Sequence, residues 1–224
     1  MMRVDAIAFD LDGTLVHSAP GIAHALNVAL AAAGLAPFDL RKVQAWIGDG
    51  PDALIARALA ASGRENVDAP DLPARLRRDF DAATLAAPMA GCSVFDGVAQ
   101  AVESLAEMLP LVVVTNKPTL LARAVLGEAG LLERFASVHG ADTTAQRKPS
   151  PLSIRQAADG LGCTTARMLM VGDAAIDIEA AHAAGCHAAW AAWGYGRAPE
   201  QTTRTVWAMK SPRELLDWVG GHVV

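Results

Sequence analysis

The chain has 224 residues, of which 52% are apolar, 19% charged and 5% aromatic. This composition is close to the average of globular proteins and excludes intrinsic disorder as the dominant state. The 19 basic and 24 acidic residues give a formal net charge of -5, which argues against an electrostatic nucleic-acid-binding surface. The length predicts one domain, or one domain that carries a large insertion.

The cysteines and the first apolar run indicate a reduced compartment. Cys92, Cys163 and Cys186 are odd in number and have no metal-ligand spacing, which argues against a disulfide scaffold. Asp10 and Asp12 interrupt the N-terminal apolar stretch, so the start does not resemble a signal peptide. Because no apolar run is long enough to span a bilayer, we expect a cytoplasmic protein with no membrane partner.

Short apolar runs that end at polar residues are typical of buried strands in a parallel sheet. The sequence predicts such strands at 4–9, 111–114 and 168–171, a further short strand ending at His139, and helices at 98–108, 119–129, 153–161 and 176–184. Strands that alternate with helices predict a Rossmann-like, doubly wound parallel sheet of the α/β class.

Residues 16–82 differ from the rest, because their helical patterns have no convincing strand between them. Helices are predicted there at 22–33, 41–47, 51–61 and 72–83. We therefore expect an all-helical cap at 16–82, inserted into a catalytic core formed by 1–15 and 83–224.

The first predicted strand ends at two aspartates two residues apart, in Asp10-Leu11-Asp12-Gly13-Thr14. Such a pair can present one carboxylate as a nucleophile and the other as a proton donor. The alternative is a capped turn in which Asp12 bonds its own backbone.

Three further polar motifs follow the later strands. Thr115-Asn116 can hold phosphate oxygens or cap a helix, and Lys148 can bind an anion or lie in solvent. Asp173 and Asp177 fit Mg²⁺ held by few carboxylates plus waters, although Asp173 could also be an N-cap. Each motif alone leaves its alternative open. Because ligands bind beyond the carboxyl ends of parallel strands, four motifs in this order favour one shared site.

The ordered motifs resemble those of the haloacid dehalogenase-like phosphatase superfamily, over residues 10–177. The resemblance implies that Asp10 attacks phosphorus and becomes a transient aspartyl phosphate. It implies that Asp12 protonates the leaving oxygen and then activates water. The remaining implied roles are Mg²⁺ binding by Asp10, the backbone carbonyl of Asp12 and Asp173, support by Asp177, and phosphate binding by Thr115, Asn116 and Lys148.

Three segments resemble phosphoglycolate phosphatases more narrowly, namely 47–50, 115–118, and 177–181 followed by 184–185. The helical insertion resembles the mobile cap of the first type in the same superfamily. These resemblances imply a Mg²⁺-dependent phosphomonoesterase for a small ester, first of all 2-phosphoglycolate, with substrate contacts from Gly48, Asp49, Gly50 and Lys117. A carboxylate of Asp49 that faced an anionic substrate would repel it.

Several alternatives remain at this point. A sugar-phosphate phosphatase or a phosphomutase of the same superfamily would share these motifs, and a noncatalytic phosphate-binding or partner-docking module would share the fold. Dehalogenation is disfavoured, because a halide leaves without a proton and gives Asp12 no role. We expect a monomer or homodimer, a hinge position for His17 and packing roles for the five tryptophans.

Overall fold

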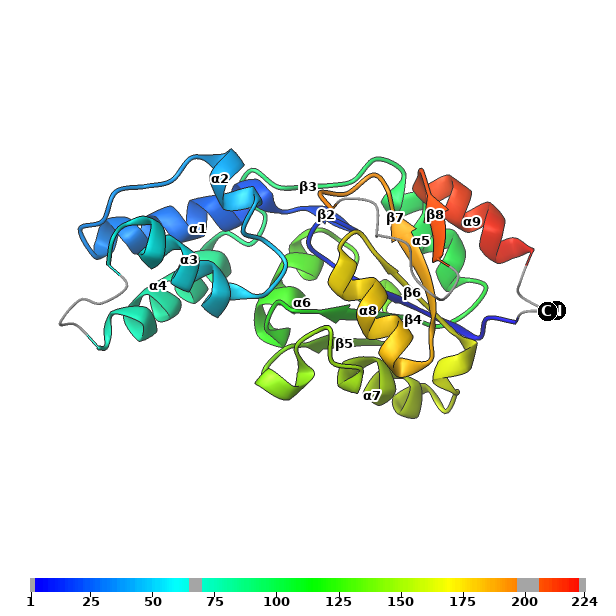
Figure 1. Cartoon of the computed structure of the whole chain (residues 1–224). Helices are drawn as coiled ribbons and strands as arrows, with labels where there is room; N and C mark the ends of the chain where they lie inside the picture. Colours follow the sequence, from blue (N-terminus) through cyan, green and yellow to red (C-terminus); the bar gives the residue numbers. More distant parts are fainter. Residues whose placement is uncertain (1–2, 65–69, 197–205, 222–224) are drawn as a thin grey trace.

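The computed structural model of the chain describes residues 3–64, 70–196 and 206–221. Figure 1 shows a helical part that lies beside a larger part built around a sheet. The two parts correspond to the predicted cap and core, and the helical cap on an α/β core is confirmed.

The core sheet has six strands, and every neighbouring pair is parallel, as predicted. Their order is β5-β4-β1-β6-β7-β8. The strands are β1 (Ala6–Phe9), β4 (Leu111–Thr115), β5 (Ser137–Gly140), β6 (Met168–Gly172), β7 (His187–Ala191) and β8 (Val206–Met209). The central strand β1 pairs with β4 on one side and with β6 on the other, so the polar residues that follow these three strands lie at one edge.

Helices cover both faces of this sheet. They are α5 (Val98–Ala106), α6 (Thr119–Glu128), α7 (Leu152–Leu161), α8 (Ala175–Ala184) and α9 (Pro212–Gly220), with 3₁₀ turns η1 (Leu132–Arg134), η2 (Thr144–Gln146) and η3 (Thr165–Arg167). Ile7 and Phe9 pack in one core with α5, α6 and α9. Ala6 and Ala8 pack in the opposite core with α7 and α8. Alternate residues of β1 are therefore buried on opposite faces, which explains its nearly continuous apolar sequence.

The cap consists of α1 (Ala19–Ala32), α2 (Leu40–Gln44), α3 (Pro51–Ala61) and α4 (Leu72–Ala86). It has its own apolar core, in which Leu26, Leu76 and Phe80 meet Leu121 of α6. The last cap helix continues beyond residue 82, and residues 65–69 of the predicted cap lie outside the described ranges. The exact domain boundaries stay a prediction.

Core and cap are joined by two chain segments that pair with each other. These segments form a short antiparallel ladder of β2 (Val16–His17) and β3 (Ser93–Val94). His17 lies here, with its ring 5.7 Å from Phe95 and 5.4 Å from Tyr195. The ladder therefore gives His17 the hinge position expected for it.

Two further observations concern the cysteines and the length of the helices. The three cysteines are free thiols, which agrees with the absence of a disulfide scaffold expected above. Within the described part of the chain, no helix is both long and apolar enough to cross a membrane.

Candidate active site

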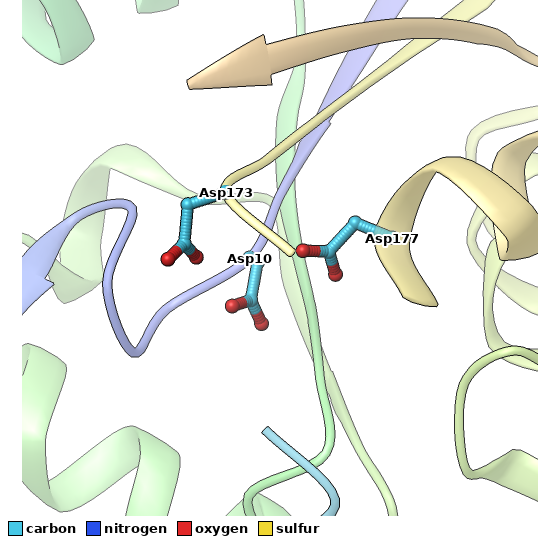
Figure 2. A group of neighbouring side chains, drawn as sticks. All are labelled: Asp10, Asp173 and Asp177. Carbon is cyan, nitrogen blue, oxygen red and sulfur yellow. The ribbon is translucent and has the colours of Figure 1, made fainter. Parts of the chain in front are cut away.

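Three buried carboxylates meet at the carboxyl edge of the sheet. Asp10 follows β1, Asp173 follows β6, and Asp177 lies in the first turn of α8. Figure 2 shows their carboxyl groups gathered in one place, although Asp10 lies far along the sequence from Asp173 and Asp177. One oxygen from each lies within 4.8 Å of the others. Such an oxygen-rich cluster is the donor set that Mg²⁺ prefers.

Lys148 is the cation of this cluster. Its Nζ donates to Asp10 Oδ1 at 2.6 Å, to Asp177 Oδ1 at 2.6 Å and to the carbonyl of Val114 at 3.1 Å. Burial alone would lower the pKa of Lys148, but the two carboxylates together raise it above its usual value. Lys148 is therefore charged, and it is a component of the site rather than a solvated surface residue.

The net negative charge of the cluster can be balanced by a divalent cation. Three carboxylates and the Lys148 ammonium sum to a charge of -2 when all are ionised. Burial, which disfavours the charged form, raises the pKa of Asp10 to about 6 even though Lys148 opposes the shift. Burial and the nearby Asp10 likewise raise the pKa of Asp173 to about 6. The residues present thus fit a bound Mg²⁺, which would neutralise the excess charge.

Asp12 is held by a second lysine. Lys117 Nζ donates to both carboxylate oxygens of Asp12, at 2.9 and 2.8 Å. The side chain of Lys117 is 7% exposed. Asp12 is thus not merely a turn residue bonded to its own backbone, and Lys117 is not a surface lysine.

Thr115 ends β4 and Asn116 follows it, and the two side chains make different contacts. The hydroxyl oxygen of Thr115 accepts the N–H of Lys117 at 3.2 Å and borders the smaller cavity described below. The side chain of Asn116 is engaged at both ends, since its Oδ1 accepts the N–H of Lys148 at 2.7 Å and its Nδ2 donates to the carbonyl of Gly48 at 2.9 Å. The amide of Asn116 thus bridges the lysine loop and the cap, and its expected contact with phosphate stays a prediction.

Of the three cap residues predicted to contact substrate, two line the cavity and one does not. Gly48 and Gly50 line the space above Asp10. Asp49 does not, because its carboxylate forms an ion pair with Arg57, which also donates to the carbonyl of Trp46 at 2.7 Å. The repulsion considered for Asp49 is thereby reduced, since its charge is paired within the cap.

A further ion pair joins the cap to the core. Arg147, which precedes Lys148, donates to Asp52 at the start of α3 at 2.7 Å. Asp52 is also paired with Arg77 of α4. With the bond between Asn116 and Gly48, this contact holds the cap loop over the strand ends.

Two cavities meet at Asp10 and Asp12. The smaller has a volume of about 40 Å³ and lies under the cap. It is lined largely by apolar side chains, including Ile47, Leu54 and Phe80, and Lys117 is the one cation among the described residues that line it. The larger, of about 690 Å³, holds Asp173 and Asp177 and opens past α2. A substrate over Asp10 would thus have a polar side and a small, largely apolar side.

Sequence reasoning missed the segment after β7. Trp190 and Trp193, which were assigned to packing, also donate from Nε1 to the carbonyls of Asp173 and Thr14, at 3.0 and 2.9 Å. The backbone N–H of Tyr195 donates to Asp173 at 2.8 Å. The signal that could have found this segment is its Gly-Tyr-Gly sequence directly after an apolar run, where a site residue is expected in a parallel sheet.

A family model of haloacid dehalogenase-like hydrolases matches residues 4–185. The chain belongs to this family. The match extends from β1 through α8 and so includes all the motif residues discussed above.

Individual relatives of this hydrolase are similar over nearly the whole chain. A phosphoglycolate phosphatase from Rhodospirillum rubrum is 42% identical over 219 residues, which cover 96% of this chain and 90% of the relative. One from Pectobacterium atrosepticum is 37% identical, with coverage of 87% and 83%. The expected enzyme class, a phosphatase, is confirmed by these relatives.

Solved structures agree in fold. The crystal structure of a predicted phosphoglycolate phosphatase from Haemophilus somnus superposes with a TM-score of 0.87 at 30% identity, covering 97% of this chain and 99% of the other. The structure of CbbY from Rhodobacter sphaeroides in complex with phosphate has a TM-score of 0.80 at 25% identity, with coverage of 95% and 96%.

Proposed function

We propose that this phosphatase hydrolyses 2-phosphoglycolate in a Mg²⁺-dependent reaction that passes through an aspartyl phosphate on Asp10. The observation that carries the proposal is the pairing of each loop aspartate with its own buried lysine, Asp10 with Lys148 and Asp12 with Lys117. This arrangement gives the two carboxylates of one loop separate partners. Lys148 offsets the negative charge of Asp10, the nucleophile. Asp12 would carry the proton of a general acid once Lys117 leaves it to bind the substrate carboxylate.

Asp10, the backbone carbonyl of Asp12 and Asp173 would hold Mg²⁺, with Asp177 supporting through water or through Lys148. When bound, the ion supplies the positive charge that offsets repulsion between a carboxylate nucleophile and a phosphate dianion. Lys148, which donates to Asp10 at 2.6 Å, contributes positive charge to the same task.

The chain's own residues then carry out two displacements at phosphorus. In the first, a carboxylate oxygen of Asp10 forms a bond to phosphorus while the ester P–O bond breaks, and Asp12 gives its proton to the leaving oxygen. In the second, water attacks phosphorus, Asp12 takes the proton from that water, and the bond to Asp10 breaks to release phosphate. Thr115, Asn116 and Lys148 would bind the phosphoryl oxygens in both steps.

The cavity under the cap supports a small acidic leaving group. Its volume of about 40 Å³ corresponds to only a few water-sized probes, at roughly 10–15 Å³ each. Lys117 lies where a substrate carboxylate would arrive, and most of the surrounding cap side chains are apolar and offer no partner for sugar hydroxyls. The lysine and the apolar lining of this cavity, rather than its size, support phosphoglycolate over sugar phosphates, in agreement with the names of the relatives.

A panel of small esters tests the proposal. We expect Mg²⁺-dependent release of phosphate, with the highest kcat/KM for 2-phosphoglycolate among 2-phosphoglycolate, ethyl phosphate and glucose 6-phosphate. A preference for glucose 6-phosphate would favour the sugar-phosphate alternative, and isomer formation from a sugar phosphate without phosphate release would favour a mutase. Phosphate binding without turnover of any ester would favour the noncatalytic alternative. Cytoplasmic location and a monomeric or homodimeric state stay predictions.

A further inference from the structure

The carboxylate of Asp173 is surrounded by donors from one short loop. The backbone N–H groups of Tyr195 and Gly196 both donate to Asp173 Oδ2, at 2.8 and 3.0 Å. The hydroxyl of Thr14 donates to Oδ1 at 3.2 Å. Asp173 itself is 3% exposed. With both oxygens bonded, the plane and the direction of this carboxylate are fixed by its neighbours.

The loop can approach this closely only because two of its residues lack a side chain. An added Cβ at Gly196 would overlap the backbone carbonyl oxygen of Asp173, and one at Gly194 would overlap the Cβ of Asp173 and the carbonyl oxygen of Gly13. Neither glycine has a positive φ. Glycine is therefore needed at both positions because neighbouring atoms lie too close for a Cβ, and not because the backbone has an unusual conformation.

The same loop also contacts the hinge of the cap. The phenolic oxygen of Tyr195 accepts the N–H of Ala19, the first residue of α1, at 3.0 Å. Its ring lies against His17 and Phe95, with centroids 5.4 and 6.1 Å away. One residue thus contacts Asp173 through its backbone and the start of the cap through its side chain.

We propose that residues 194–196 are a positioning loop that orients Asp173 for Mg²⁺ and ties the metal site to the cap hinge through Tyr195. The inference rests on the metal site of the proposed function. Tyr195 and Gly196 act through Asp173, so their expected effect is on metal affinity. Partners of this kind typically change metal affinity by about 10–100-fold.

Calorimetric titration of the substrate-free protein with Mg²⁺ tests the loop. We expect Gly196→Ala to raise the Kd for Mg²⁺ at least about tenfold. The matched control is Gly160→Ala in α7, where an added Cβ meets no atom within 4 Å, and its Kd should equal that of the wild type. Thermal unfolding without Mg²⁺ shows whether each variant is folded. A folded Gly196→Ala variant with the wild-type Kd would overturn the inference. A wild-type protein that binds no Mg²⁺ would overturn the metal site itself.

A second measurement needs no destabilising variant. Tyr195 is the single tyrosine of the chain, so labelling with 3-fluorotyrosine gives one ¹⁹F resonance at the hinge. We expect Mg²⁺ to shift this resonance with the Kd found by calorimetry, and Asp173→Asn to remove the shift. A resonance that is unchanged at saturating Mg²⁺ would overturn the link between metal and hinge.

Discussion

Lys117 and Asp12 form a two-point ion pair across 105 residues of sequence, with Nζ at 2.9 and 2.8 Å from the two carboxylate oxygens. The pair lies in the wall of the small cavity under the cap. Under the proposed function, an arriving substrate carboxylate would compete with Asp12 for this lysine, and Lys117 would then connect substrate recognition with the proposed acid–base residue.

Replacing Lys117 by Met should reduce discrimination for the acidic substrate. Loss of a charge-assisted hydrogen bond of about 1.5–3 kcal/mol predicts a fall of roughly 10–100-fold in kcat/KM for 2-phosphoglycolate. Ethyl phosphate, which has no carboxylate, should lose less. The altered environment of Asp12 affects both esters, so the ratio of the two kcat/KM values isolates the substrate contact. An unchanged ratio would show that Lys117 does not bind the carboxylate.

Asp10→Asn should remove turnover while leaving the fold intact. Without the nucleophilic carboxylate, kcat should fall at least about a thousandfold, which corresponds to roughly 4 kcal/mol. Asp5→Asn is a matched control, because Asp5 pairs with Arg3 and Arg167 at the other end of β1. Steady-state phosphate release and thermal unfolding measure the two properties. Near-normal release by Asp10→Asn would contradict the mechanism.

The ion pair between Arg147 and Asp52 should favour the closed cap. Because exposed pairs contribute up to about 1 kcal/mol, Asp52→Asn should raise KM by at most about fivefold with little change in kcat. Salt should raise the KM of the wild type more than that of the variant. Glu103→Gln, which removes the 2.7 Å pair with Arg134 within the core, should leave KM unchanged. Equal effects of the two substitutions would argue against a role for Asp52 in closure.

Mg²⁺ binding should depend on pH through the buried carboxyl groups. Burial raises the pKa of Asp10 and Asp173 from 3.8 to about 6. Because their protonated forms are favoured in the metal-free fold, the stability they contribute is complete below pH 3.8 and is lost as the pH rises through about 6. Mg²⁺ requires the ionised forms.

The affinity for Mg²⁺ should therefore increase between about pH 5 and pH 7, and binding should release protons near pH 5 but not near pH 8. Calorimetry in buffers of different ionisation enthalpy measures this release directly. Proton release that is the same at both pH values would show that these carboxyl groups do not bind the ion.

The sequence by itself determined the fold class and the presence of a helical cap, and it predicted which polar residues lie at the strand ends. Apolar runs identify β1, β4 and β6, because strands buried on both faces need continuous hydrophobic sequence. Strand β7 was missed, since its sequence His-Ala-Ala-Trp-Ala is alanine-rich and has none of the β-branched residues that indicate a strand. Since parallel strands end at one edge, motif order also predicts that Asp10 and Asp173 meet.

Only the tertiary structure decided which partner each site residue has. The amide of Asn116 bridges Gly48 and Lys148, Asp49 pairs with Arg57, and Tyr195 holds Asp173 from 22 residues away. Sequence patterns report burial and periodicity along the chain, whereas these contacts depend on where loops from separate elements lie after folding and on the direction of each side chain. The sequence therefore predicts which polar residues lie near the site, but it does not predict which partner each of them contacts.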